Sequence, residues 1–338
     1  MKAAVLRNLG KPLVIEHLIP PQLGRGQVLV EYMFSGVCRS QLMEVRGGRG
    51  EDRWLPHLLG HEGVGLVLEI GPEVETVKVG DTVVVGWLET SGIDAKPAAY
   101  VSSKTGEKIN SGKAVTFATH AIVSENRVFL KPKSISNKTA VLLGCALPTG
   151  AGMVLNETCP SSEDKILIIG LGGIGMSVLV TLLMKGINNI SIIEPNEEKL
   201  ALAKLLGAKG FLTKSADKLK ITDYFDLCYE ASGQIQGIES GFNLINNSGT
   251  LIFASHPPSG ELISLDPHQL IQGKKIIGSW GGGGSPEIIA TKIEKLDHHD
   301  YLARLLGEEY SLFEIDRALS DLESGKSLRP IIKMSNYG

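Results

Sequence analysis

A glycine-rich turn that follows an apolar run constrains the fold of this chain more than any other feature. Residues 165–170 read KILIIG, and residues 170–175 read GLGGIG. The spacing G-x-G-x-x-G in this context predicts a strand, a tight turn and a helix that begins at the turn. Gly170 allows the turn, Gly172 lets the backbone approach a pyrophosphate, and Gly175 lets the helix pack closely on the strand. The N-terminus of such a helix offers N–H groups and a positive dipole end to phosphates.

An acidic residue closes the next apolar segment. NISIIE ends in Glu194, about twenty residues after the glycine turn. Its carboxylate can accept hydrogen bonds from both hydroxyls of an unphosphorylated adenosine ribose, whereas it would repel a 2′-phosphate. No arginine follows in EPNEEK. The sequence therefore favours NAD over NADP, and a glycine turn that binds no ligand is the structural alternative.

Two sequence patterns divide the 338 residues, a length that fits two domains. As far as about residue 130, β-branched runs bounded by Gly or Pro indicate short strands, namely VLVEYMFSGVC, GVGLVLEIG and DTVVVGW. From about Glu163, short apolar strands alternate with helical stretches, namely KILIIG, MSVLVTLLMKG, NISIIE, NEEKLALAKLLGA, DLCYEA and GTLIFAS. This alternation indicates a parallel sheet with helices on its faces. The polar stretch from Leu88 to His120 indicates a surface lobe, and GSWGGGGSPE near 278–287 indicates a junction.

The composition excludes several classes of partner. A net charge of −3 provides no basic surface for nucleic acid or an anionic membrane. The uncharged run from Ile166 to Met184 approaches the length of a membrane span, but glycines interrupt it, so a strand, turn and helix explain it better. MKAAVLRNLG at the start is too short for a signal-peptide core, and four widely spaced cysteines make a poor disulfide framework. We therefore expect a cytoplasmic protein with thiols available to a metal.

Residues suited to zinc occur in three separate segments. GVCRSQ contains Cys38, GHEGVG contains His61 and Glu62, and GCALPTGAG contains Cys145. Thiolate and neutral imidazole are ligands that zinc prefers, and three protein ligands with an open position are typical of a catalytic site. Taken singly, the cysteines would more often be buried core residues, and His61 a core histidine. Spacing alone does not bring these distant residues together.

These three segments, their order and the later glycine turn resemble the medium-chain, zinc-containing alcohol dehydrogenase family. VKVGDTVVV and GKSLRPIIK match as well, so the resemblance covers essentially the whole chain. It implies that Cys38, His61 and Cys145 bind a catalytic zinc, with Glu62 as a nearby carboxylate that binds transiently.

The same resemblance implies an α/β fold with two domains. A doubly wound Rossmann sheet that binds NAD, residues 147–281, is expected as an insertion in a β-rich, GroES-like catalytic domain. That catalytic domain is expected to comprise residues 1–146 and 282–338.

The resemblance also assigns residues to the cofactor and to the proton path. Ser40 matches the hydroxyl that takes the alcohol proton. The positions that match cofactor contacts are Arg39 and Arg329 for phosphates, Thr149 and Ile174 for the nicotinamide ring, Glu194 and Lys199 for the ribose, and Gly170, Gly172, Gly173 and Gly175 for the loop.

Three departures from the family pattern qualify these expectations. Met43 occupies a position where relatives often have a histidine that carries the proton to solvent, so the proton must leave by another route. Gln41 replaces an acidic residue that holds the zinc histidine; a neutral amide can still orient His61 but donates less charge. The stretch from Leu88 to His120 lacks the four cysteines that bind a structural zinc in many relatives. We therefore expect one catalytic zinc per subunit and no structural zinc.

The sequence constrains the substrate pocket only weakly. Met43 and Trp87 match pocket positions, and His256 falls where an apolar pocket residue is common. A polar tip there indicates a hydroxylated substrate such as a polyol or sugar-like alcohol, unless His256 is a surface or dimer-strand histidine. The remaining residues considered receive no role, namely His57, His120, His268, His298, His299, Cys159 and Cys228.

Together these features predict a zinc-dependent oxidoreductase that transfers a hydride between an alcohol and NAD, giving an aldehyde or ketone. Zinc polarises the substrate oxygen and Ser40 relays the proton. One rival is a zinc-free enone or quinone reductase of the same superfamily, which should lack the zinc ligands; another is a non-enzymatic cofactor-binding relative. Relatives are homodimers or homotetramers. The choice between these, the particular alcohol and the physiological direction do not follow from the sequence.

Overall fold

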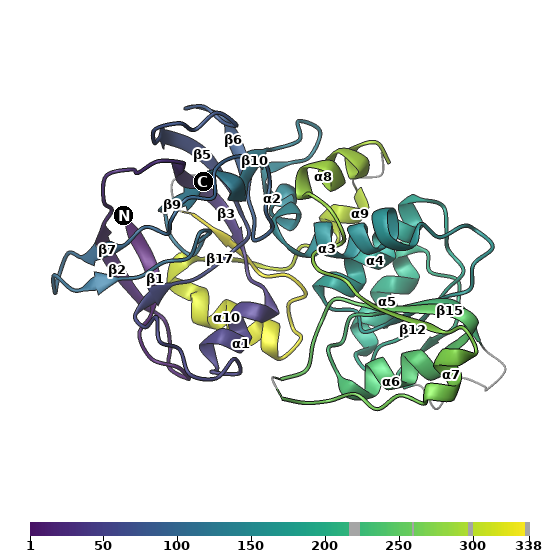
Figure 1. Ribbon diagram of the computed structural model, residues 1–338. Helices are drawn as coiled ribbons and strands as arrows, with labels where there is room; N and C mark the ends of the chain where they lie inside the picture. Colours follow the sequence, from purple (N-terminus) through teal and green to yellow (C-terminus); the bar gives the residue numbers. More distant parts are fainter. Residues whose placement is uncertain (216–223, 259, 297–299, 335–338) are drawn as a thin grey trace. The chain divides into compact units, whose positions relative to one another are not determined.

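The computed structural model describes residues 1–215, 224–258, 260–296 and 300–334 (Figure 1). Its contacts divide the chain into two compact units. The first comprises Met1–Cys145, Ser285–Glu294 and Leu306–Gly338, and the second comprises Ala146–Gly284 and Lys295–Leu305. His298 and His299 lie outside the described residues.

The division by contacts differs from the predicted domain division at Ala146, at residues 282–284 and at Lys295–Leu305, all of which belong to the second unit. Lys295–Leu305 was expected in the catalytic domain but belongs to the second unit. The reason is packing, because α9 (Asp300–Ala303) contacts α4 (Gly173–Met184) and Leu302 is completely buried. The burial of Leu302, the one buried residue of α9, therefore joins this segment to the second unit.

The first unit is built on two β-sheets. One has the strand order β4-β1-β2-β7-β8, and the other has the order β10-β6-β5-β3-β18-β17 with β9 paired to β3. The strands are β1 (Lys2–Leu6), β2 (Val14–Ile19), β3 (Gln27–Gly36), β4 (His57–Leu58), β5 (Gly63–Ile70), β6 (Thr82–Val85), β7 (Tyr100–Ser102), β8 (Lys108–Ile109), β9 (His120–Ser124), β10 (Val128–Leu130), β17 (Glu309–Ser311) and β18 (Ile331–Lys333). Since β18 pairs antiparallel with β3, the end of the chain completes the sheet that carries the first ligand segment.

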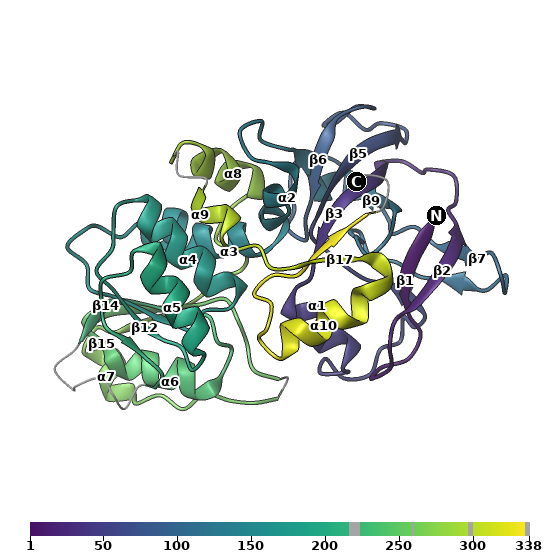
Figure 2. The same ribbon diagram turned by 180° about the vertical axis from the view of Figure 1, so that it is seen from behind.

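Short helices connect and cover these sheets. They are α1 (Arg39–Val45), α2 (Asn137–Ala140), α8 (Pro286–Glu294) and α10 (Ile315–Glu323), with the 3-10 turns η1 (Glu125–Arg127), η2 (Val141–Gly144) and η5 (Leu312–Glu314). Helices α1 and α10 lie side by side (Figure 2). This contact again joins an early segment of the chain to a late one.

The polar stretch expected as a surface lobe contains regular structure. Strands β7 and β8 pair antiparallel within it. The buried carboxylate of Glu125 fixes its start by accepting the N–H groups of Ile93 at 2.7 Å and Thr76 at 2.9 Å. Burial by itself raises the pKa of Glu125, but these N–H groups outweigh it and hold the pKa below its usual value.

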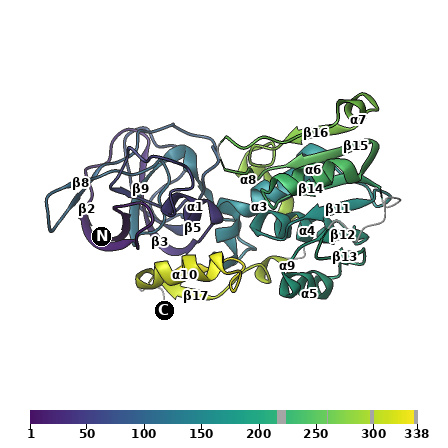
Figure 3. The ribbon, with the colours of Figure 1, turned by 90° about the horizontal axis from the view of Figure 1, so that it is seen from below.

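The second unit is a parallel sheet with helices on both faces. Its elements are α3 (Ala146–Gly152), the π-helix η3 (Met153–Thr158), β11 (Ile166–Ile169), α4, β12 (Ile190–Ile193), α5 (Glu197–Leu206), β13 (Leu212–Thr213), β14 (Phe225–Glu230), α6 (Ile235–Leu244), β15 (Ile245–Phe253), α7 (Pro267–Ile271), β16 (Lys275–Gly278) and α9. The strand order is β13-β12-β11-β14-β15-β16 (Figure 3). Helices α3 and α4 lie on one face, and α6 and α7 on the other (Figures 1 and 2).

This order confirms the predicted Rossmann sheet. The connections run outward in both directions from β11 and β14, which places the switch point where β11 ends in the glycine turn. All four residues of β11 are buried, as expected for a strand covered on both faces. Asn196 caps the N-terminus of α5 by accepting the N–H of Lys199 at 3.1 Å, and Gly207 caps its C-terminus.

No single helix among the described residues is long and apolar enough to cross a membrane. The consecutive helical segments over Asn137–Gly144 and Ala146–Thr158 reach the required length and composition only when taken together.

Candidate metal centre and dinucleotide loop

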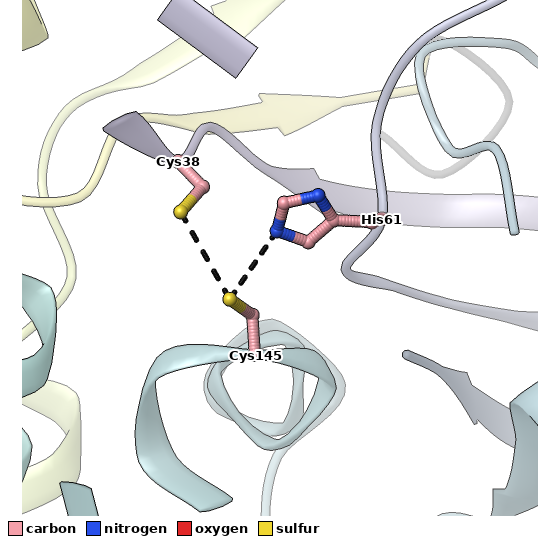
Figure 4. Close-up of side chains that lie close together, drawn as sticks. All are labelled: Cys38, His61 and Cys145. Atoms are coloured by element: carbon pink, nitrogen blue, oxygen red, sulfur yellow. Dashed lines mark hydrogen bonds between the residues drawn. The ribbon is translucent and has the colours of Figure 1, made fainter. Parts of the chain in front are cut away.

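Three side chains with zinc-binding atoms converge in the first unit. Cys38 caps the N-terminus of α1, His61 lies between β4 and β5, and Cys145 follows η2. The sulfur of Cys38 lies 3.9 Å from the sulfur of Cys145, which lies 3.2 Å from Nε2 of His61 (Figure 4). All three ligand atoms lie within 4.8 Å of one another. The structure therefore brings together the set that the sequence predicts, around a point that one ion can occupy.

Glycines let these ligand segments approach one another. Gly36 precedes Cys38 by two residues, and a Cβ atom there would lie 2.8 Å from the carboxyl group of Glu62. A Cβ on Gly144, next to Cys145, would lie 2.8 Å from Cα of Glu62. The segments that carry the ligands can be this close only because both positions lack a side chain.

The two thiols differ in acidity in the described structure. A hydrogen bond from Cys145 holds the pKa of Cys38 well below its usual range, against the effect of burial, and the nearby Arg329 charge acts in the same direction. The same hydrogen bond, together with burial, raises the pKa of Cys145. In the metal-free site these opposite shifts favour the thiolate on Cys38 and the thiol on Cys145. Ligation of a metal by both sulfurs would require the Cys145 proton to leave.

A buried ion pair lies next to the ligands. Nη2 of Arg329 donates to Oε2 of Glu62 at 2.5 Å, and the two side chains are 5% and 0% exposed. Burial raises the pKa of the Glu62 carboxyl to about 6, and the Arg329 charge limits that rise. Oε1 of Glu62 is buried and has no hydrogen-bond partner among the described residues. Glu62 itself lies outside the cluster of three ligand atoms within 4.8 Å of one another, so its transient binding to a metal stays a prediction.

The pairing of Arg329 with Glu62 was not expected from the sequence, which assigned Arg329 to a cofactor phosphate. The structure buries the guanidinium against the carboxylate, and a contact with phosphate stays a prediction. The sequence did contain a signal for a buried ion pair, because a lone arginine directly precedes the apolar segment PIIK. An arginine at the start of a buried strand needs a buried anion.

Helix α1 places two polar side chains against His61. The hydroxyl of Ser40 lies 3.5 Å from Nε2 of His61, beside the metal-binding atoms. Gln41 is 2% exposed; its Oε1 accepts the backbone N–H of Cys38 at 3.1 Å, and its Nε2 contacts Nδ1 of His61. Ser40 is thus placed to exchange a proton near the centre, and Gln41 connects two of the ligands.

Other predicted site residues of the first unit lie on neighbouring elements. Arg39 is exposed at the start of α1, and Met43 is half-buried on the same helix. Trp87 is half-buried after β6, and its backbone N–H donates to the carbonyl of Gly144 at 3.2 Å, one residue before Cys145. Their contacts with cofactor or substrate stay predictions.

In the second unit, the glycine turn has the conformation that its sequence requires. Gly170 adopts a φ of +86°, which favours glycine. A Cβ on Gly175 would overlap the carbonyl oxygen of Gly170, so α4 can pack closely on β11 only with glycine there. Gly172 caps α4, and a Cβ on it would meet nothing within 4 Å. The N-terminus of α4, with Gly173 and the half-buried Ile174, therefore faces open space.

Glu194 lies beside this turn at the end of β12. It is 5% exposed, and its two oxygens accept the N–H groups of Leu171 at 2.6 Å and Asn196 at 3.0 Å. The acidic residue expected to recognise a ribose therefore also holds the glycine turn in place.

Three further residues of this unit were assigned roles from the sequence, Thr149 and Lys199 at the cofactor and His256 in the substrate pocket. Thr149 is buried in α3, and Lys199 is half-buried in the first turn of α5. His256 is exposed after β15, where its Nδ1 lies 2.7 Å from the carbonyl oxygen of Pro257. These positions leave the predicted roles as predictions.

A further acidic residue at the same edge of the sheet was missed by the sequence reasoning. Glu230, completely buried at the end of β14, accepts the N–H groups of Ser232 at 2.8 Å and Gly233 at 3.2 Å. A Cβ on Gly170 would lie 2.8 Å from the nitrogen of Ser232, so this turn packs directly on the glycine turn. The signal was present in DLCYEA, an apolar strand closed by a carboxylate, as in NISIIE.

Comparison with known proteins agrees with this geometry. Residues 24–133 match the alcohol dehydrogenase GroES-like domain, and residues 173–297 match the zinc-binding dehydrogenase domain. An alcohol dehydrogenase of Moraxella sp. (strain TAE123) is 30% identical over 279 residues, covering 78% of this chain and 80% of that protein. The S-(hydroxymethyl)glutathione dehydrogenase of Komagataella pastoris is 28% identical over 371 residues, covering 98% and 97%.

Solved structures of alcohol dehydrogenases have the same fold as this chain. Benzyl alcohol dehydrogenase from Acinetobacter calcoaceticus superposes with a TM-score of 0.86 at 25% identity, covering 99% of both chains. The chain belongs to the zinc-type medium-chain alcohol dehydrogenases, as its motifs predicted.

The buried ion pair gives a stability prediction. Arg329→Met should lower the free energy of unfolding of the metal-free protein by about 3–5 kcal/mol, because it leaves the Glu62 carboxylate buried without a counter-charge. The double variant Arg329→Met with Glu62→Met should recover most of that loss, since it removes both charges. Urea denaturation at pH 7 measures both changes.

The matched control is a surface pair of the same type. Arg317 lies 3.0 Å from Glu314, with side chains 58% and 43% exposed. Arg317→Met should therefore cost less than about 1 kcal/mol. A double variant as unstable as Arg329→Met alone would show that the ion pair does not carry this stability.

Proposed function

We propose that this chain is a zinc-dependent dehydrogenase that transfers a hydride between a small alcohol and NAD, with an aldehyde or ketone as the product. The observation that carries the proposal is the convergence of Cys38, His61 and Cys145 in one chain with a G-x-G-x-x-G turn. Family membership supports oxidoreduction of alcohols, and the zinc and NAD requirements rest on the residues described here. We favour secondary, polyol or sugar-like alcohols as the substrate class, because the polar side chain of His256 takes a pocket position where an apolar residue is common.

The donor set fits a catalytic zinc. Two sulfurs and one imidazole nitrogen leave a fourth tetrahedral position open. Glu62, whose buried Oε1 has no partner among the described residues, is outside this cluster and is the carboxylate we propose to bind transiently. Bound zinc would supply a Lewis acid that polarises the substrate oxygen and favours its alkoxide form. A zinc-free reductase has no use for this ligand set.

We propose a single zinc per subunit. The stretch from Leu88 to His120 contains no cysteine. A second group of potential ligands, Glu44, Asp52 and His57, has its ligand atoms within 4.8 Å of one another. In that group, however, the ring nitrogens of His57 lie 2.8 Å from Asp52 and 3.0 Å from the carbonyl of Leu58, so its atoms already bond to protein groups.

NAD is favoured over NADP by charge. Glu194 is held beside the glycine turn by two backbone N–H groups, which keep its carboxylate at the end of β12. A 2′-phosphate bound near this position would experience repulsion from the carboxylate. A ribose with two hydroxyls can donate hydrogen bonds to it instead.

Ser40 is the group we propose to take the alcohol proton. Its hydroxyl both donates and accepts hydrogen bonds, and its oxygen lies 3.5 Å from Nε2 of His61. Met43 on the same helix cannot accept a proton, so the proton would leave Ser40 by another route, either the ribose hydroxyls of bound cofactor with water or some other group. In this arrangement Arg39, exposed one residue earlier, is free to face the cofactor phosphates.

We further propose a homo-oligomer in the cytoplasm, a dimer or a tetramer. The outer edge of β16 is unpaired among the described residues, and Ile277 on that strand is 37% exposed. An unpaired, partly apolar edge is suited to pairing with a second copy of the same strand.

The central experiment measures metal content and cofactor reduction together. The purified chain should contain about one zinc per subunit and reduce NAD, but not NADP, with a panel of primary, secondary and polyhydroxy alcohols. Zinc removal by a chelator should abolish the reaction, because the oxygen would no longer be polarised. Cys38→Ser should lose zinc, whereas Cys159→Ser, an exposed thiol outside the cluster, should retain it. A zinc-free chain that reduces enones with NADPH would contradict the proposal.

Ser40 gives a second prediction. Ser40→Ala should lower kcat by about 10²- to 10⁴-fold with zinc content unchanged, because it removes the proton acceptor but no ligand. Ser40→Thr keeps a hydroxyl and should retain most of the activity. Equal activity of the alanine and threonine variants at neutral pH would exclude the relay.

The oligomeric state can be measured directly. Sedimentation equilibrium should give two or four times the chain mass of 36.2 kDa. Ile277→Lys places a charge on the β16 edge and should shift the protein toward a smaller species. Lys275→Ala, on the same strand, is the control and should leave the mass unchanged. A monomeric wild-type protein would contradict this part of the proposal.

A further inference from the structure

Gln41 is the one side chain of helix α1 that contacts two of the zinc ligands at once. Its Oε1 accepts the backbone N–H of Cys38 at 3.1 Å, and its amide nitrogen Nε2 contacts Nδ1 of His61 and lies farther, at 3.4 Å, from Nε2 of the same ring. The side chain is 2% exposed, so solvent does not compete for these contacts. Its donors and acceptors must therefore match those of Cys38 and His61.

The chemistry of the three groups fixes which end of the amide faces which neighbour. The N–H of Cys38 can only donate, so it requires the amide oxygen. The NH₂ end of Gln41 then faces Nδ1 of His61 and donates to it. In the neutral ring, the single proton must consequently reside on Nε2. On that side the ring faces the sulfur of Cys145 at 3.2 Å, which can accept it.

This protonation pattern opposes metal binding. Nε2 of His61 is the atom that lies with the two sulfurs, so it must lose its proton to become a ligand. The proton of a neutral ring would then reside on Nδ1 and face the NH₂ group of Gln41, which is also a donor. The amide can remove this conflict by turning over, but its NH₂ group would then face the N–H of Cys38. One donor loses its acceptor in either orientation.

We propose that Gln41 is a positioning residue that weakens zinc binding by holding His61 in the tautomer with the proton on Nε2. This inference rests on the proposed zinc site. It predicts that a residue with two acceptor atoms at position 41 removes the conflict. The substitution Gln41→Glu supplies two acceptors at the same side-chain length, since one carboxylate oxygen can accept from Cys38 and the other from Nδ1 of His61. Groups that orient a metal-bound histidine alter metal affinity by about 10- to 100-fold.

The tautomer can be observed without metal or catalysis. In metal-free protein labelled with ¹⁵N-histidine, NMR at pH 8 should show His61 with its proton on Nε2. Gln41→Glu should move the proton to Nδ1, and the loss of signals in His61→Asn assigns the ring. A wild-type His61 with its proton on Nδ1, or a Gln41→Glu ring with its proton still on Nε2, would overturn the proposal, whatever the activity of the enzyme.

Zinc affinity is the second measurement. Competition with a chromogenic chelator at pH 8 should show a zinc Kd for Gln41→Glu about 10- to 100-fold lower than for the wild type. Met43→Glu adds the same charge on the same helix without touching His61 and should change the Kd by less than about threefold. If both variants lowered the zinc Kd equally, the gain in affinity would come from the added charge. If Gln41→Glu had the same zinc Kd as the wild type, the amide would not oppose zinc binding. Either result overturns the proposal.

These outcomes are distinguishable from failure of the proposed function. A wild-type chain that binds zinc and shows the Nδ1 tautomer would contradict only the role of Gln41. A chain with the Nε2 tautomer that binds zinc in no variant would contradict the zinc site itself. Circular dichroism of each metal-free variant, compared with the wild type, establishes that the chain is folded in the measurement.

Discussion

The metal centre depends on a buried charge that the protein must neutralise. The carboxylate of Glu62 follows a zinc ligand directly and is completely excluded from solvent, so leaving it unpaired would cost several kcal/mol. Arg329 supplies the opposite charge from a position 267 residues later in the sequence. Arg329 lies just before β18, which pairs with β3, and residues 310–334 add apolar side chains to the core of the first unit. The late segment therefore supplies both the counter-charge and part of the sheet, with the Rossmann sheet inserted between the two parts of the first unit.

The close approach of the ligand segments is a second constraint, and it is steric. Gly36 and Gly144 each lie against Glu62 at distances that no Cβ atom could tolerate. Gly60 adopts a φ of +92° one residue before His61, and a Cβ there would overlap the hydroxyl of Thr116. Each ligand motif therefore contains a glycine whose lack of a side chain allows the ligand to reach the centre. In the motifs GVC, GHE and GC, the glycine allows close packing and the cysteine or histidine supplies the metal-binding atom.

The two units differ in how far their sequences determine them. The class of the second unit and four of its strands were predicted because these strands are short apolar runs that alternate with helical stretches. Strands β13 and β16 and helices α6, α7 and α9 were not predicted, although α5 carries local start and stop signals in Asn196 and Gly207. These signals are local, and they fix the parallel sheet with little reference to distant residues. Segment 295–305 was assigned to the wrong unit, because the burial of Leu302 against α4 is a tertiary contact that no local pattern reports.

The residues of the metal site could be predicted from the sequence even less well than the fold. Cys38, His61 and Cys145 could be nominated only through resemblance to a family, since no spacing rule connects residues in three segments. The pairing of Glu62 with Arg329 required knowledge of which side chains are buried together. Glu230 was missed because the sequence analysis assigned a role to the carboxylate that closes β12 and not to the one that closes β14. In each case the deciding fact is proximity between residues far apart in the chain.

Gln41 separates two properties that an acidic residue would combine. A carboxylate at this position offers two acceptor atoms and one negative charge, whereas an amide offers one acceptor, one donor and no charge. In the metal-free site, Cys38 and Glu62 already carry negative charges that burial disfavours, and Arg329 balances only one of them. A neutral residue adds no further charge to this buried group, and this stabilises the metal-free fold. The same amide lacks the second acceptor atom that His61 needs when it binds a metal. At position 41, glutamine therefore favours the stability of the metal-free site, whereas an acidic residue favours its affinity for zinc.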